Sequence, residues 1–307
     1  MDIGAEMEAG VSRTLHIGAR SEPLTTLRAL WHGPGDPQMA VATDSVARAM
    51  RMASGPASLQ LRRSGGVLVA TAWGPGAPEA LAAVPALTGE LDDPTPLVPQ
   101  HPLLTELVRR LPGARLTSGS PLIEVLVPAI LGQKVTSIES RNAHRSLIAK
   151  FGEPAPGPLG LLLPPPAEKL ARLPYWAFHP LGIERRRADA VRAAAAAAPH
   201  LAQLEKLSRD EARRRLTAVP GVGPWTAAET MRLALGDPDA VSVGDYNLPR
   251  LVCWALAGEL GRDDARMLEL LEPYRGQRAR VIMLIERSGI HVPRFGPRLA
   301  PRSIAAQ

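Results

Sequence analysis

The chain has 307 residues, and 36 Lys and Arg against 30 Asp and Glu give it a net charge of +6. That length allows two domains or one large one. The net positive charge fits a polyanionic partner, although it could equally serve only to keep the protein soluble. A single cysteine, Cys253, excludes an intrachain disulfide and a four-cysteine iron–sulfur cluster, and its apolar neighbours predict a core position. The histidines are scattered, so no metal site is expected, and no apolar run reaches the roughly 18 residues of a membrane span. Residues 1–11 lack an apolar core, so we expect no secretory signal and a cytoplasmic protein.

The first hundred residues predict a small α+β domain. Residues 1–12 are expected to be disordered. Short β-rich runs then follow between glycine-containing turns, at 14–17, 39–42, 46–52, 58–62 and 67–72. The last two flank Ser64-Gly65-Gly66 and predict a hairpin. Residues 77–87 predict a helix, and 90–101 a linker between a domain at 13–100 and a second one at 101–293.

From residue 101 the spacing of apolar residues becomes helical. The predicted helices are 102–111, 121–131, 137–151, 166–172, 184–197, 208–219, 224–235, 246–260, 263–271 and 278–288. Ser208 with Glu211 three residues later predicts a capping box. The Pro- and Gly-rich stretch 153–166 predicts a loop between helices, and 294–307 a C-terminal tail. The aromatic cluster 175–179 is interpreted as packing.

The most informative segment is 216–250. The turn Pro220-Gly221-Val222-Gly223 separates two predicted helices, and its glycines allow close approach of another backbone. Pro224 suits the first turn of the second helix, where the N–H groups are free to bind an anion such as a phosphodiester. A loop, Gly236-Asp237-Pro238-Asp239, and an isolated Gly244-Asp245-Tyr246 follow.

This order and spacing resembles the helix-hairpin-helix–Gly/Pro–Asp (HhH-GPD) superfamily of DNA base-excision glycosylases. Within it, the chain is most similar to the bacterial AlkA-type 3-methyladenine glycosylases. The resemblance runs from about residue 101 to 293 and includes the loop Ile130–Thr136, the run Leu181-Gly182-Ile183 followed by Arg185–Arg187, and the closing helix. It implies an α+β fold, in which a small TBP-like N-terminal domain precedes an all-helical domain with a cleft between two lobes.

The resemblance also implies the setting in which the protein acts. Its partner would be damaged double-stranded DNA, and we expect a monomer in a bacterial nucleoid, with no membrane partner. No cofactor is expected, although a monovalent cation at the hairpin turn is compatible with the resemblance.

Asp245 is the predicted catalytic residue. N-glycosidic cleavage leaves positive charge on the sugar, so a carboxylate beside C1′ lowers the barrier and can also orient the attacking water. The alternative role is a helix N-cap, because Asp245 directly precedes a predicted helix. The two roles are compatible.

Trp225 and Tyr246 are predicted to line the base pocket. Trp225 occupies the position after Gly223-Pro224, close to where relatives that also cut the backbone carry a Schiff-base lysine, so a monofunctional enzyme that uses water is expected. An aromatic face there could stack on an extruded base. The alternative for Trp225 is a plain core residue.

Glu229 and Glu286 depart from the resemblance, which implies aromatic residues at both positions. In a pocket, a carboxylate would attract a cationic alkylated purine. The alternative is that each pairs with an arginine such as Arg232 or Arg287. These two residues leave the preferred lesion open.

The predicted DNA-binding residues come from three segments. Gly221, Val222, Gly223 and Thr226 form the hairpin turn and the start of the next helix. The resemblance places Gln133 and Lys134 on the loop that fills the gap left by the flipped nucleotide, although Lys134 could be a plain surface lysine. Arg187 ends a basic run that either contacts the DNA backbone or is a solvated face.

The sequence therefore predicts a monofunctional glycosylase that flips and hydrolytically excises damaged purines, with alkylated purines the first choice. One alternative is a glycosylase for another damaged purine such as hypoxanthine. The other is a non-catalytic helix-hairpin-helix protein that binds DNA.

Overall fold

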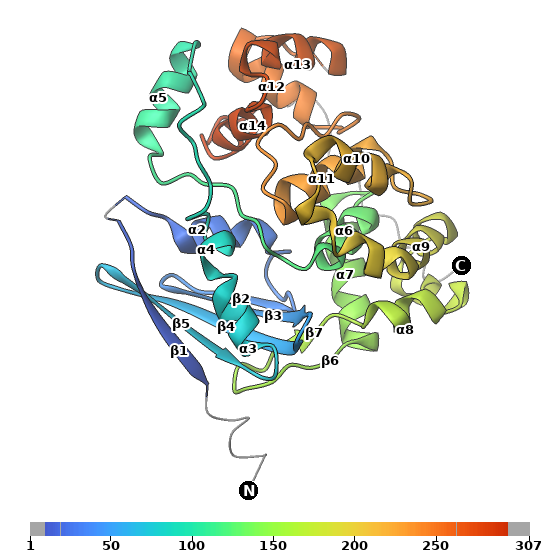
Figure 1. The fold of residues 1–307 in the computed structure, drawn as a ribbon. Coiled ribbons are helices and arrows are strands. Elements are labelled where there is room, and N and C mark those ends of the chain that lie inside the picture. The colour runs from blue at the N-terminus through green and yellow to red at the C-terminus, as the bar shows by residue number, and fades with distance from the viewer. Residues whose placement is uncertain (1–9, 19, 262, 294–307) are drawn as a thin grey trace, which may run out of the picture.

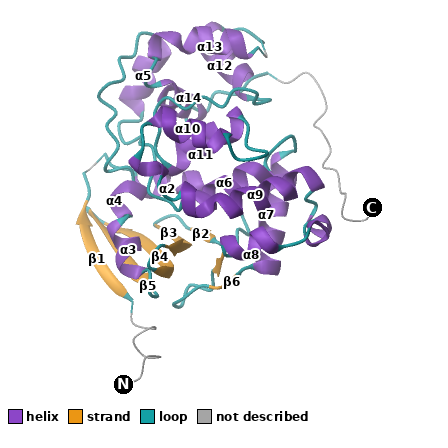
Figure 2. Ribbon diagram, turned by 45° about the vertical axis from the view of Figure 1, so that its right-hand side comes forward, coloured by secondary structure: helices purple, strands orange, loops and turns teal. Residues whose placement is uncertain are grey.

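The computed structural model describes residues 10–18, 20–261 and 263–293, and it confirms the α+β class. Strands gather at one end of the molecule and helices stack beside and above them (Figures 1 and 2). The predicted tail at 294–307 and residues 1–9 of the predicted disordered N-terminus lie outside the described residues.

The N-terminal part is a five-stranded antiparallel sheet with strand order β1-β5-β4-β3-β2. Its strands are β1 (Val11–His16), β2 (Met39–Val41), β3 (Ser45–Met52), β4 (Gly55–Ser64) and β5 (Val67–Trp73). The predicted hairpin at Ser64–Gly66 joins β4 to β5. The expectation of disorder up to residue 12 is wrong for Val11 and Ser12, which pair with Ala72 and Thr71. The partner strand is distant in sequence, so local patterning could not reveal this pairing.

Both faces of strand β3, which lies between β4 and the edge strand β2, are covered, and its residues alternate between them. Val46 and Met50 face the main core, whereas Ala47 and Ala49 pack on Leu161 and Leu163. The latter two belong to the predicted loop 153–166, which contains a short two-stranded sheet of β6 (Glu153–Pro154) and β7 (Leu162–Leu163). This segment is therefore a cover for the sheet and not only a connection.

The predicted helix at 77–87 is two helices, α3 (Ala77–Ala82) and α4 (Val84–Leu87). Pro85 explains the break, since it has no N–H and its ring clashes with the carbonyl one turn earlier. An unpredicted short helix, α2 (Pro23–Leu27), precedes β2.

Each predicted helix after residue 101 is present, with small shifts at the ends. The helices are α5 (Pro102–Arg110), α6 (Leu122–Leu131), α7 (Ser137–Phe151), α8 (Ala167–Arg172), α9 (Arg185–Leu201), α10 (Arg209–Thr217), α11 (Pro224–Ala234), α12 (Leu248–Ala257), α13 (Asp264–Leu271) and α14 (Arg278–Glu286). The capping box predicted at Ser208 is only half formed. Ser208 Oγ accepts from the Glu211 N–H at 3.3 Å, but the Glu211 carboxylate binds Arg214 and Arg215 instead.

The helices belong to two apolar cores. The larger core joins the sheet to α6, α9 and α11, and the second is built by α5 together with α12, α13 and α14. Helix α5 thus packs with the C-terminal helices, at the top of Figure 1. Because the larger core is continuous across residue 100, packing alone does not separate the predicted domains, and their division stays a prediction.

A buried polar junction fastens helix α6 to the sheet. The Glu124 carboxylate accepts from Gln38 Nε2 at 2.7 Å and from the Arg51 N–H at 2.6 Å, with Arg48 Nη2 at 3.4 Å. Burial raises the pKa of Glu124, against the opposing effects of Arg48 and these hydrogen bonds. The junction therefore depends on the carboxylate keeping all of its partners.

Glu124→Ala should lower the free energy of unfolding by about 3–5 kcal/mol, because it leaves Arg48 buried without a counter-charge. Urea denaturation of the purified protein measures the loss. Glu106→Ala is the matched control, since Glu106 pairs with Arg109 on the surface and should cost no more than about 1 kcal/mol. Equal, small losses in both variants would contradict the role assigned to this junction.

Candidate active site

The hairpin turn between α10 and α11 packs on helix α9. Gly221 has φ of 84°, a left-handed conformation, and a Cβ there would lie 2.5 Å from the Ala190 Cβ. Glycine is therefore required both by backbone angle and by the close approach of α9. A Cβ at Gly223 would meet nothing within 4 Å, so the space beside this turn is open. Gly223 is the N-cap of α11, whose first N–H groups lack intrahelical acceptors.

Other predicted hairpin contacts are limited by burial. The side chains of Val222 and Thr226 are buried, and the Thr226 hydroxyl accepts a hydrogen bond from Gln133 Nε2 at 2.8 Å. The same Gln133 nitrogen also donates to the Gly221 carbonyl at 2.9 Å. Val222 and Thr226 could therefore bind an anion at this turn only through their backbone groups, and not through their side chains. The Gln133 side-chain amide connects the loop after α6 to the hairpin.

Asp245 is held from two sides. Its Oδ1 accepts the backbone N–H groups of Asn247 at 2.7 Å and Leu248 at 2.8 Å, and its Oδ2 accepts Trp225 Nε1 at 3.0 Å. The carboxylate therefore caps the start of α12, which begins two residues later than predicted. The cap leaves the carboxyl group half-buried and fixed beside the indole.

Trp225 connects Asp245 to the loop that follows α6. A Cβ at Gly132 would lie 3.3 Å from the far edge of the Trp225 ring, so the indole reaches this loop. The ring is half-buried and its nitrogen is bonded to Asp245, which does not fit a plain core residue. Tyr246 is instead 60% exposed, so the structure places it on the surface beside Asp245.

An arginine joins the two predicted pocket glutamates. Arg232 Nη2 lies 3.1 Å from Glu229 Oε2, and its Nη1 lies 3.3 Å from Glu286 Oε2. The pairing alternative is therefore confirmed for Arg232. It is wrong for Arg287, which pairs with Glu22. Trp225, Glu229 and Arg232 share one face of α11, since their spacing is that of successive turns.

This cluster is electrostatically coupled to Asp245. The pKa of Glu286 is raised, first by burial and then by the charges of Glu229 and Asp245, while Arg232 opposes the rise. Burial lowers the pKa of Arg232, but Glu229, Glu286 and Asp245 together raise it above its ordinary value. Glu229 and Glu286 thus share the Arg232 guanidinium, and the nearby charge of Asp245 acts on the same cluster. Sequence reasoning missed Ser242, which donates to Glu229 from the loop before Asp245.

Lys134 and Arg187, both predicted to bind DNA, are placed differently. Lys134 is exposed and has φ of 54°, the one left-handed residue other than glycine in the described part of the chain. Such strain is often kept at functional loops. Arg187 is buried, and its guanidinium donates to the Leu131 and Gly182 carbonyls at 2.8 and 3.0 Å. The prediction that Arg187 contacts DNA is therefore wrong, because its guanidinium is used to join two protein loops.

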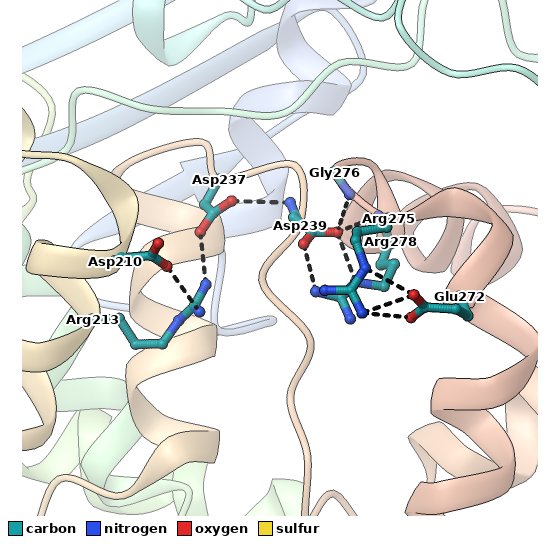
Figure 3. A network of polar contacts seen from close by, with 8 residues as sticks. All are labelled: Asp210, Arg213, Asp237, Asp239, Glu272, Arg275, Gly276 and Arg278. Carbon is teal, nitrogen blue, oxygen red and sulfur yellow. Dashed lines mark hydrogen bonds and ion pairs between the residues drawn. The ribbon is translucent and has the colours of Figure 1, made fainter.

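The loop 236–239 between α11 and Asp245 bridges the two cores (Figure 3). Asp239 accepts the N–H groups of Gly276 and Arg278, and its Oδ2 lies 2.5 Å from Arg278 Nη2. Asp237 accepts from the Asp239 N–H at 3.0 Å and lies 3.8 Å from Arg213 Nη2 on α10. This loop therefore fixes where Asp245 stands relative to the hairpin.

A cavity lies elsewhere in the molecule. It measures about 280 Å³ and lies between the sheet and helices α6 to α8, lined in part by Glu124 and His144. Neither Asp245 nor Trp225 lines it. Within the described ranges, no three His, Cys, Asp or Glu residues are grouped to hold a metal ion. None of the helices there is long and apolar enough to cross a membrane.

No family model matches the chain. It is 32% identical over 151 residues to a probable bifunctional transcriptional activator/DNA repair enzyme AlkA of Mycobacterium tuberculosis, covering 48% of this chain and 30% of that protein. It is 24% identical over 152 residues to a DNA-3-methyladenine glycosylase of Bacillus subtilis, covering 48% and 50%. These alignments span half or less of each relative.

Solved structures show the same fold over most of the chain. The 3-methyladenine DNA-glycosylase from Archaeoglobus fulgidus matches with a TM-score of 0.73 at 20% identity, covering 89% of this chain and 96% of that one. MBOgg1 in complex with a low-affinity DNA ligand matches with a TM-score of 0.70 at 16% identity, covering 91% and 95%. In part of its sequence and in its fold, the chain is thus similar to AlkA-like DNA glycosylases, the resemblance that its hairpin and the Asp245 motif predict.

Proposed function

We propose that the chain is a monofunctional DNA glycosylase that removes alkylated purines from duplex DNA by hydrolysis. The observation that carries the proposal is the fixed Asp245 carboxylate, which the Trp225 indole and the start of α12 hold next to the hairpin. The names of the similar proteins, which include 3-methyladenine glycosylases and a DNA repair enzyme, support alkylated bases as the substrate.

In this proposal the backbone N–H groups at Gly221–Gly223 and the start of α11 bind a phosphate beside the lesion. The damaged base leaves the stack at a cost of a few kcal/mol, about the cost of losing one base pair. The bond from C1′ to the purine nitrogen then breaks, and its electron pair leaves with the purine. Water adds to C1′ and loses a proton, and Asp245 both stabilises the positive sugar and orients that water.

The remaining parts of the proposal concern the state of the enzyme. It acts as a monomer on damaged duplex DNA in a bacterial nucleoid, without an organic cofactor or an iron–sulfur cluster. The carbonyls of the hairpin turn would suit a monovalent cation. The N-terminal sheet corresponds to a TBP-like domain, in front of the helical glycosylase domain.

The function is tested with a panel of duplexes, each containing one lesion: 3-methyladenine, 7-methylguanine, hypoxanthine or 8-oxoguanine. The proposal expects abasic sites to form fastest from the two alkylated purines. Faster release of hypoxanthine would favour a glycosylase for deaminated purines. Binding to the duplexes with no release from any of them would favour a non-catalytic DNA-binding protein.

Asp245→Asn should reduce the single-turnover rate of base release by roughly 100- to 1,000-fold, because it removes the negative charge beside the sugar. Affinity for DNA should be retained and thermal stability should fall only slightly, since an asparagine oxygen can still cap α12 although its NH2 group cannot accept from Trp225 Nε1. Asp210→Asn is the control, because Asp210 is an exposed carboxylate whose ion-pair partner among the described residues is Arg213. A normal rate in the Asp245 variant would remove this residue from the mechanism.

Borohydride should not trap the protein on DNA during turnover. A covalent imine requires an amine nucleophile, and Trp225 stands in place of the lysine that could supply one. The measurement is a gel-shift of denatured samples after turnover with the best substrate of the panel. A stable cross-linked band would show that an amine of this chain attacks the sugar and that the enzyme is a lyase.

Glu229→Gln should slow release of a cationic 7-alkylpurine roughly fivefold more than release of neutral hypoxanthine, as expected for losing one charge near the base. Glutamine keeps the size of the side chain and an oxygen that can accept from Ser242. The comparison of both lesions with the same variant is an internal control. Equal losses on both, or a lower melting temperature with unchanged selectivity, would mean that Glu229 only supports Arg232.

A further inference from the structure

Trp176 is the most exposed large apolar residue in the described part of the chain. Its side chain is 73% exposed, within a short 3-10 turn at Tyr175–Ala177. The interpretation of this aromatic cluster as packing is right for Phe178, which is fully buried, and wrong for Trp176. Burying an indole is favourable because it removes apolar surface from water. A partner that covers Trp176 would therefore gain this free energy on binding.

Two exposed arginines, Arg185 and Arg186, begin the helix that follows this turn. Arg185 stands over the Tyr175 ring, with its Cζ 5.7 Å from the ring centre. Arg185 and Arg186 are both exposed at the start of α9. The first turn of this helix contains no acidic residue. Arg185 has only a loose contact with Asp189, at 3.7 Å. Arg186 takes part in none of the ion pairs formed among the described residues.

Helix α9 connects the turn that bears Trp176 to the hairpin and to the loop after α6. Arg187 donates to the Leu131 carbonyl at the end of α6 and to the Gly182 carbonyl beside Trp176's turn. Ala190, one turn further along α9, contacts the hairpin at Gly221. Helices α6, α9 and α11 accordingly lie together in Figure 1. The start of α9 therefore borders both segments that are proposed to touch DNA.

We propose that Trp176, with Arg185 and Arg186, forms a second DNA-binding surface on which an unpaired base stacks while the lesion is extruded. The inference rests on the proposed function, because only extrusion of a base disrupts stacking in the duplex. An aromatic face accepts any base, so the surface reads distortion and not sequence. The two arginines supply contacts to the adjacent phosphates.

The test compares the affinity of Trp176→Ala for three DNAs: an intact duplex, the same duplex with one tetrahydrofuran abasic site, and a single strand. Stacking on an unpaired base predicts about tenfold weaker binding to the abasic duplex and to the single strand. Binding to the intact duplex should change less than twofold, because its bases remain stacked on one another. Trp176→Phe should bind like the wild type, since it keeps an aromatic face.

Two further variants serve as controls. Leu91→Ala removes another apolar side chain, 72% exposed, from a different part of the surface, and should leave all three affinities unchanged. Arg186→Ala should weaken binding to all three DNAs and reduce the slope of log affinity against log salt by about one for the duplexes.

Three results would overturn the inference: abasic-duplex affinity of Trp176→Ala equal to that of Leu91→Ala, equal losses on intact and abasic duplexes, or a Trp176→Phe variant as weak as the alanine variant. These outcomes are distinct from failure of the proposed function. That failure would be seen in the wild-type protein, as no base release from any lesion of the panel.

Discussion

The Asp245 carboxylate is the point on which the local structure depends, because its two oxygens bind different parts of the protein. One oxygen accepts two backbone N–H groups at the start of α12, and the other accepts the indole N–H of Trp225 from α11. Helix α12 belongs to the second core and α11 to the first. A single side chain thereby joins the two cores at the place where the chemistry is proposed. The hydrogen bonds also keep the carboxylate oriented before a substrate arrives, so that little reorganisation is needed during reaction.

Charge pairs across the same boundary support that geometry. Arg278 holds Asp239 in the loop before Asp245, and Arg232 on α11 reaches Glu286 on α14. Partly buried pairs of this kind contribute little net stability, because desolvation offsets their attraction. Their directional geometry can instead fix how the two lobes are placed. In the proposed reaction, the carboxylates of Asp245, Glu229 and Glu286 suit a cationic leaving base and a positive sugar.

The side proposed to bind DNA is built from segments that meet only in the folded chain. The hairpin glycine Gly221 packs on α9, and Gln133 connects the loop after α6 to that hairpin. The buried Arg187 then joins this loop to the turn that exposes Trp176. Short polar connections therefore hold the surface segments, while the apolar parts of α6, α9 and α11 form the core beneath them.

The sequence by itself determined the ten helices after residue 101, the five strands of the N-terminal sheet and the hairpin with its following Asp245, because periodicity and glycine positions are local properties. It also determined the AlkA-like resemblance, which runs from about residue 101 to 293 and depends most on the segment 216–250. Tertiary structure alone decided the pairing of Val11 and Ser12, the burial of Arg187 and the exposure of Trp176. Each of these depends on a partner, or the lack of one, far away in sequence. The pairing of Glu229 and Glu286 with Arg232 was also decided by the tertiary structure. Glu229 lies four positions after Trp225, and the sequence there is the same whether the carboxylate faces a base or an arginine. Only the position of α14 relative to α11 brings Glu286 to Arg232, and no local pattern encodes that distance.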